Sequence, residues 1–89
     1  MMVERQVTVM NSHGIHARPA AEIVKTAARF KASITLVKDD LDVNGKSIMG
    51  VMMLAAECGS TITLRADGDD AAPAIDALAA LIAGKFGES

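Results

Sequence analysis

Apolar positions recur along this chain with two different spacings, and each spacing predicts one kind of element. Val3, Val7 and Val9 alternate with polar residues in a two-residue period, interrupted only by Arg5, which predicts a first strand. The same alternation predicts three more short strands, around residues 34–36, 41–43 and 62–66. The two middle strands are close enough in sequence to meet at a turn near Asp39.

Helical spacing occurs in three other segments. From Ala17 to about Ala28 the apolar residues recur three and four positions apart, which predicts an amphipathic helix. Ser47 is suited to cap a second, short helix that runs to about residue 54 or 56. Gly59 is suited to end that helix in a left-handed conformation.

The third helix is predicted to begin after Asp70. With Asp70 as N-cap, Pro73 falls at the third helical position, where no intrahelical hydrogen bond is lost. Gly84 ends the helix, and its buried stripe is expected to comprise Ile75, Leu78, Ala79 and Ile82. The resulting order of strands and helices predicts an α+β protein, with an antiparallel sheet covered on one side by helices.

Length and composition add further limits. Eighty-nine residues suffice for one small domain, expected to span residues 1–89, and two Phe with no Trp or Tyr require an aliphatic core. The lone Cys58 cannot close a disulfide within the chain, so we expect a reducing compartment and a buried, inert thiol. No segment predicts a signal peptide or membrane insertion, so we expect a cytoplasmic protein. A net charge of −2 without base-stacking aromatics argues against nucleic-acid binding.

The segment Gly14-Ile15-His16-Ala17-Arg18-Pro19 places a histidine at the predicted mouth of the first helix, with an arginine two residues on. The positive end of a helix attracts anions, and a guanidinium adds a planar set of donors. An imidazole there can accept a phosphoryl group on a ring nitrogen and give it up again, because such a transfer needs positioning and charge neutralisation more than a metal. An ordinary capping or surface histidine is the alternative that spacing alone leaves open.

Metal chemistry is not expected. His13 forms an H-x-x-H pair with His16, but two ligands without a neighbouring carboxylate or thiol do not make a zinc site. The acids at positions 39, 40 and 42 are interpreted as a solvated hairpin tip, because a calcium loop needs further ligands. We therefore expect no metal and no other cofactor.

Residues 48–54 are apolar all round except for Gly50. A helix in a two-layer domain buries only one face, so some of these side chains must reach solvent or a partner. Flexible methionines suit a surface that meets several partners of different shape. The alternative is an over-hydrophobic core helix or a strand.

The string from Gly14 to Ala21 resembles the HPr family of histidine phosphocarrier proteins, as does the string Gly45-Lys46-Ser47-Ile48-Met49-Gly50-Val51-Met52-Met53-Leu54. The resemblance covers nearly the full length, because the spacing between the two motifs and the closing Ala-rich helix are similar too. It implies an open-faced sandwich, in which three helices cover one face of a four-stranded antiparallel sheet. His13 departs from the family pattern, which usually has Asn, Ser or Leu there.

The resemblance also implies roles for single residues. In the family the residue matching His16 receives a phosphoryl group on Nδ1 from enzyme I and passes it to an EIIA-type domain, while the arginine matching Arg18 stabilises the phosphate. Such a protein is a monomeric carrier rather than an enzyme. Ser47 matches the serine that HPr kinase phosphorylates, although a plain N-cap explains it as well. The implied docking face comprises Ala17, Ala21, Lys25, Lys46, Ile48, Met49 and Met52.

Two alternatives to sugar-linked phosphate transfer stay open. Residues 45–56 and the tail Phe86-Gly87-Glu88 also resemble the nitrogen-related branch of the family, in which the phosphorylation state regulates partners and no sugar moves. The other is a binding module or corepressor that works through phosphorylated Ser47 and the methionine face. A catalytic enzyme is disfavoured, because no acid–base pair, metal cluster or phosphate-cradling loop accompanies the histidine.

Overall fold

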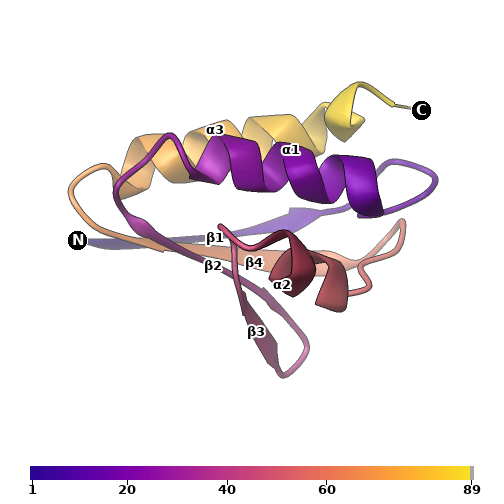
Figure 1. Cartoon of the computed structure of the whole chain (residues 1–89), viewed down its shortest axis with the longest axis horizontal. Coiled ribbons are helices and arrows are strands. Elements are labelled where there is room, and N and C mark those ends of the chain that lie inside the picture. Colours follow the sequence, from indigo (N-terminus) through magenta and orange to yellow (C-terminus); the bar gives the residue numbers. More distant parts are fainter. Residues whose placement is uncertain (89) are drawn as a thin grey trace.

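The structure, a computed structural model, describes residues 1–88, so the last residue of the expected 1–89 domain lies outside the described residues. Four strands form one antiparallel sheet in the order β1-β4-β2-β3 (Figure 1). The strands are β1 (Met2–Thr8), β2 (Ser33–Lys38), β3 (Leu41–Asn44) and β4 (Thr61–Asp67). The four predicted strands are confirmed, and Asp39 lies in the turn between β2 and β3 with a φ of 55°.

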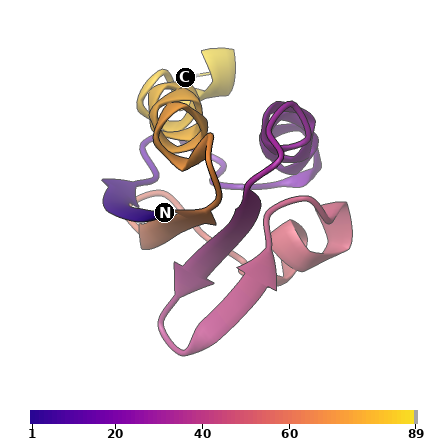
Figure 2. The same ribbon diagram turned by 90° about the vertical axis from the view of Figure 1, so that its left-hand side faces the viewer.

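Three helices cover one face of this sheet. They are α1 (Ala17–Ala27), α2 (Ile48–Met53) and α3 (Ala71–Ala83), and a short 3-10 turn, η1 (Lys85–Gly87), follows. Figure 2 shows α1 and α3 side by side over the sheet, with α3 above β1 and β4 and α2 beside α1 and β3. The open-faced sandwich is confirmed. Within residues 1–88, none of the helices has the length and apolar character needed to cross a membrane.

The core between the two layers is aliphatic. Along β2 and β4 the side chains alternate between the covered and the open face, as the two-residue period requires. The largest fully buried side chains include Ile23, Leu36, Ile62, Leu64, Ile75, Leu78 and Ile82. Each stabilises the fold by about 1.5–3 kcal/mol relative to an exposed position. Their burial is what holds the helices on the sheet.

Charged side chains of β1 form ion pairs on both faces of the sheet. Arg65, in β4, donates to Glu4 at 2.6 Å on the open face. Arg5, which interrupts the apolar alternation of the first strand, pairs with Asp76 of α3 at 2.8 Å. Because β1 is an edge strand, the Arg5 guanidinium reaches solvent at the rim of the helix layer, and its charge is not buried.

Asp70 precedes α3 as predicted and places Pro73 at the third helical position. Its carboxylate does not cap that helix but accepts the N–H groups of Lys31 and Ala32, both at 2.8 Å. The hydrogen bond from Lys31 is the main cause that lowers the pKa of Asp70. Asp70 thus ties the start of α3 to the loop that follows α1.

Two expectations for the segment after α2 are wrong. The left-handed residue that ends the helix is Ala55, with a φ of 50°, and Gly59 lies in the next turn. The chain turns early because Leu54 and Ala56 on either side pack into the core. Cys58 is exposed rather than buried, because the loop that joins α2 to β4 runs over the surface.

Candidate functional site

His16 lies at the N-terminal mouth of α1. It is the N-cap residue, its backbone is extended (φ −86°, ψ −167°), and its ring makes no capping hydrogen bond. The imidazole is thus left available, with 43% of the side chain exposed. The first N–H groups of a helix have no partner within it, so Ala17 and Arg18 supply backbone donors beside the ring, whereas Pro19 has none.

The loop before His16 is fastened to the segment that follows α2. Ile15 donates its N–H to the carbonyl oxygen of Ala56 at 2.8 Å, and its side chain is buried. Gly14 has a φ of 64°, and a Cβ at this position would overlap the same carbonyl oxygen. Glycine therefore allows the two loops to touch, which determines where α1 begins and where the imidazole lies.

A carboxylate from the C-terminal tail lies against the His16 ring. The distances from His16 Nε2 to Glu88 Oε2 and Oε1 are 3.0 and 3.2 Å. Arg18 donates to Oε2 through Nη2 at 2.8 Å and through Nε at 3.1 Å. Asn11 donates to Oε1 through Nδ2 at 3.0 Å. Three side chains from the start of α1 and its preceding loop thus converge on one anionic group.

These contacts keep Glu88 ionised. Only 17% of its side chain is exposed, and this burial acts to raise the pKa. The hydrogen bonds from His16, Arg18 and Asn11 outweigh the burial and lower the pKa of Glu88 from 4.5 to about 2. At neutral pH the donors at the mouth of α1 therefore surround a negative charge.

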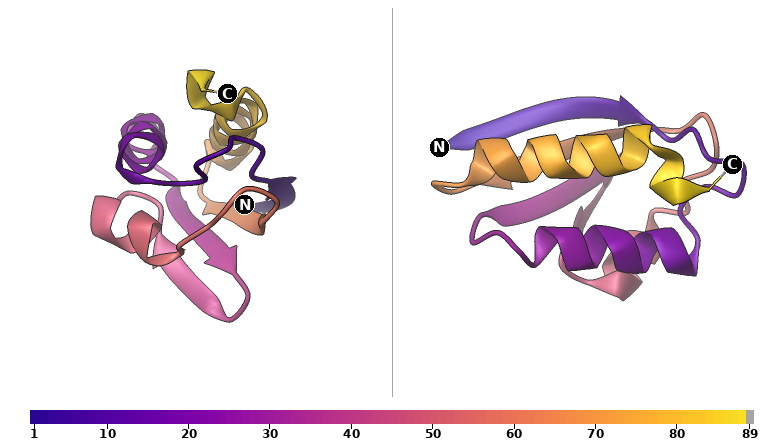
Figure 3. Two further views of the ribbon diagram at one scale, coloured as in Figure 1. Left: turned by 90° about the vertical axis from the view of Figure 1, so that its right-hand side faces the viewer. Right: turned by 90° about the horizontal axis from the view of Figure 1, so that it is seen from above.

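The tail that carries Glu88 is anchored at two further points. Arg18 Nη2 also donates to the carbonyl oxygen of Phe86 at 2.8 Å. The Phe86 side chain is buried, which offsets the cost of a φ of 55° for an aromatic residue. Asn11 is fully buried and also donates to the carbonyl oxygen of Gly14 at 2.7 Å. Figure 3 shows η1, in yellow, at the same end of the molecule as the loop that precedes α1.

The low pKa of Glu88 predicts how docking of the tail depends on pH. Because the folded value, about 2, lies below the ordinary 4.5, docking stabilises the fold fully above pH 4.5 and loses this effect as the pH falls through about 2. An NMR titration of the Glu88 carboxyl carbon should show a midpoint near pH 2. A Glu88 midpoint near 4.5 would mean that the carboxylate does not occupy the site in solution.

His13 lies next to His16 without forming a metal site. The ring centroids are 5.9 Å apart and the planes meet at 87°, an edge-to-face contact. The part of the chain that the structure describes contains no group of three or more His, Cys, Asp or Glu side chains placed to hold a metal ion. His13 is exposed and therefore forms part of the surface around His16.

Ser47 caps α2 as predicted, since its Oγ accepts the N–H of Gly50 at 3.1 Å. The helix buries Val51 and exposes the rest of its large apolar side chains. Ile48, Met49, Met52 and Met53 are 45%, 77%, 44% and 65% exposed. The interpretation of this segment as a wholly buried helix or a strand is therefore wrong.

The other residues of the predicted docking face lie close to α2. α1 packs against α2, and its residues Ala17, Ala21 and Lys25 are exposed. Lys46 is half-buried, and its Nζ donates to the carbonyl oxygen of Phe30 at 2.7 Å. An exposed surface with both apolar and basic groups thus extends from α1 onto α2.

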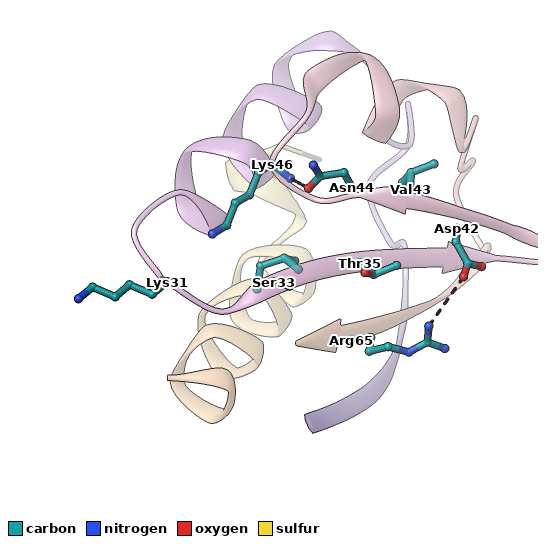
Figure 4. Close-up of a pocket in the computed structure, with 9 residues that line it drawn as sticks. Lys31, Ser33, Thr35, Asp42, Val43, Asn44, Lys46 and Arg65 are labelled. Carbon is teal, nitrogen blue, oxygen red and sulfur yellow. Dashed lines mark hydrogen bonds and ion pairs between the residues drawn. The ribbon is translucent and has the colours of Figure 1, made fainter. Parts of the chain in front are cut away.

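A hollow on the open face of the sheet borders this surface at Lys46. It has a volume of about 500 Å³ and is lined by residues of β2, β3 and β4, among them Ser33, Thr35 and Asp42 (Figure 4). Neither His16 nor Arg18 lines it. The guanidinium in the hollow, that of Arg65, lies 3.8 Å from Asp42 and is also paired with Glu4. Its charge is therefore already neutralised.

The sequence matches the family model of the PTS HPr component phosphorylation site over residues 3–84. The chain belongs to the HPr family. It is 48% identical to phosphocarrier protein HPr of Cupriavidus necator, over 98% of both chains. It is 42% identical to phosphocarrier protein NPr of Shewanella violacea, over 98% of this chain and 96% of the relative. The crystal structure of HPr-C-His from Thermoanaerobacter tengcongensis has a TM-score of 0.94 at 47% identity, with 98% of each chain covered.

Membership of the HPr family makes the chain a phosphocarrier protein of the phosphotransferase system. The structure brings together His16 and Arg18, as their spacing at a helix mouth predicted. Sequence reasoning missed the contributions of Asn11, Phe86 and Glu88. In the sequence the tail shows an aromatic residue that precedes a carboxylate by two positions, and this pattern does not predict where the tail docks.

Proposed function

We propose that the chain acts in the cytoplasm as a phosphoryl carrier for sugar uptake, with His16 as the residue that accepts the phosphoryl group. Phospho-enzyme I is the donor and EIIA-type domains are the acceptors. The observation that carries this proposal is the exposed His16 ring at the mouth of α1 with Arg18 beside it. In this proposal residues 1–89 form one domain, which acts as a monomer without a metal or other cofactor.

Incubation with phosphoenolpyruvate and enzyme I tests the proposal. We expect one phosphoryl group per chain, labile in acid and stable in base, as a phosphoramidate on an imidazole requires. Arg18 directs Nε and Nη2 at the tail and has further N–H donors for a phosphate oxygen. A protein that takes no label, or a label that base removes, would contradict the proposal.

The proposed docking surface for both partners is the exposed surface of α1 and α2 next to His16. Its apolar part consists of methionine and isoleucine side chains that have no partner within the fold to cover them fully. Unbranched methionines adapt to differently shaped partners, and a carrier has to meet a donor and several acceptors in turn. The residues proposed are Ala17, Ala21, Lys25, Lys46, Ile48, Met49 and Met52.

A regulatory role without sugar transport is the second candidate. The specific observation in its favour is the 42% identity to an NPr phosphocarrier over nearly the full length. We further propose Ser47 as the site of an HPr kinase, because its hydroxyl lies at the mouth of α2 beside exposed Met49. The helix dipole stabilises a phosphate at this position, but the phosphate places negative charge next to the docking surface.

Replacing Arg18 by Ala should slow phosphoryl transfer about tenfold to a hundredfold, because a guanidinium stabilises the charge of the transferred group. Its side chain is 49% exposed, so the free energy of unfolding should change by no more than about 1 kcal/mol. Transfer rates and melting curves check both values, with Arg29→Ala, at an exposed arginine in the turn that follows α1, as the control. A large loss of stability with an unchanged rate would make Arg18 a structural residue.

Replacing Ser47 by Asp should slow phosphorylation by enzyme I, more at low salt than at high salt, because the new charge opposes an acidic partner. The free energy of unfolding should stay the same or rise by about 0.5 kcal/mol, since Asp is a good N-cap and its charge is stabilised by the helix dipole. Ser47→Ala is the uncharged control. Met49→Glu should weaken docking by placing an unpaired charge in an apolar contact, and Met2→Glu, at an exposed methionine of β1, is its control.

Transfer rates of these variants at two salt concentrations separate charge repulsion, expected for Ser47→Asp, from the loss of apolar contact, expected for Met49→Glu. If Ser47→Asp and Met49→Glu both transfer as fast as the parent, α2 lies away from the docking surface.

A further inference from the structure

The contact between Glu88 and His16 determines which ring nitrogen carries a proton. An ionised carboxylate has no hydrogen to donate and only accepts. Both Glu88 oxygens lie within hydrogen-bond distance of His16 Nε2, at 3.0 and 3.2 Å. Nε2 must therefore be the donor.

A neutral imidazole has one N–H, so a proton held on Nε2 leaves Nδ1 with an unshared electron pair. Among residues 1–88, every hydrogen bond of the His16 ring runs through Nε2. The ring is thus anchored on one side and presents its nucleophilic nitrogen on the other.

We propose that Glu88 is a positioning residue for phosphoryl transfer, which holds His16 in the Nε2–H tautomer and orients Nδ1 for attack on phosphorus. This rests on the proposed function of His16 as the acceptor. The arrangement has the logic of a hydrolase triad, in which a carboxylate orients a histidine through one ring nitrogen while the other reacts.

The transfer step balances without a further group. The Nδ1 electron pair forms the N–P bond, and the bond from phosphorus to the donor breaks with its electron pair going to the donor. The proton stays on Nε2, so the ring becomes an N-phosphoryl imidazolium and gains a positive charge. The Glu88 carboxylate faces that charge through the Nε2–H bond and stabilises it. When an acceptor takes the phosphoryl group, the electron pair returns to Nδ1.

The carboxylate is held firmly enough for this role although it belongs to a chain end. Asn11 and Arg18 together donate three hydrogen bonds to it, at 2.8 to 3.1 Å. Buried Phe86 fixes the tail two residues earlier. A positioning group must be held by contacts of its own, and these supply them.

The test compares the parent protein with Glu88→Ala and Glu88→Gln. Glu57→Gln is the control, at an exposed carboxylate whose backbone lies against Gly14 in the loop before α1. Long-range ¹H–¹⁵N spectra of the imidazole report the tautomer without any phosphoryl donor. In the parent and in Glu57→Gln, neutral His16 should be protonated at Nε2 only. In Glu88→Ala the Nδ1–H tautomer should also be populated, because nothing then selects between the nitrogens.

The rate of phosphorylation by enzyme I should fall about tenfold in Glu88→Ala, the size expected for one lost charge-assisted hydrogen bond. Glu88→Gln, whose amide oxygen still accepts from Nε2, should lie between Glu88→Ala and the parent. A parent-like tautomer or a parent-like rate in Glu88→Ala would overturn the positioning role. A different result would contradict the proposed function itself: a His16→Ala variant would then still take up the phosphoryl label.

Discussion

Replacing His16 by Ala is expected to abolish uptake of the acid-labile phosphoryl group from phosphoenolpyruvate and enzyme I. The ring is the only nucleophile that the fold places at the start of α1 with Arg18 and the first helical amides around it, as far as residues 1–88 are concerned. Because the side chain is 43% exposed and makes no capping hydrogen bond, the fold should lose little stability. The expected loss of labelling is therefore chemical in origin.

His13→Ala is the matched control for this experiment. His13 has the same ring, lies 5.9 Å away between centroids and is exposed. We expect this variant to be labelled to the same extent as the parent. Mass measurement of the intact protein at neutral pH counts the phosphoryl groups, and peptide mapping in base locates them. Full labelling of His16→Ala, or its transfer to His13, would mean that another residue is the acceptor.

Replacing Gly14, which is buried, by Ala is expected to give the largest loss of stability of all the substitutions proposed. A side chain there has two costs, a φ of 64° that favours glycine and an overlap with the carbonyl oxygen of Ala56. Relief of the overlap must separate the two loops and weaken the hydrogen bond from Ile15 to Ala56. Together these cost about 2–5 kcal/mol. Phosphoryl transfer should slow as well, because the same loop places His16.

Gly59→Ala separates the two costs. Gly59 also has a positive φ, 93°, but no heavy atom lies within 4 Å of a Cβ built there. Its substitution should therefore cost only the backbone strain, about 1–3 kcal/mol. Denaturant unfolding of both variants measures the difference, and transfer rates of the folded proteins show whether only Gly14 affects the site. Equal stabilities and equal rates would show that the contact between the loops does not position His16.

Periodicity by itself determined the strands and helices of this protein. The two-residue alternation around Leu64 and the helical spacing around Ile23 predict elements that the structure contains, because burying one face is the dominant favourable contribution to folding. The N-cap of α2 was equally predictable. Ser47 caps α2 through its own hydroxyl, an interaction over three residues that needs no tertiary contact.

Predictions for side chains outside regular elements were less successful. Cys58 was expected inside because free cysteines are usually buried, yet its loop runs over the surface. The left-handed end of α2 falls on Ala55, because the core takes the neighbouring Leu54 and overrides the preference of Gly59 for such a position. In both cases the packing of neighbouring residues determines the conformation, and the spacing of residues along the chain does not predict that packing.

The sequence alone also predicted that His16 and Arg18 lie together at the mouth of a helix, because a histidine and a cation two residues apart at a helix start are a local feature. Only the tertiary structure brought Glu88 to them, from 72 residues away in sequence in the case of His16. Similarly, the Asp70 carboxylate accepts a hydrogen bond from the N–H of Lys31, 39 residues away in sequence, instead of capping its own helix. Hydrogen bonds between distant segments form only after hydrophobic burial has set the layers in place. Such hydrogen bonds depend on the complete fold, so the local sequence pattern does not predict them.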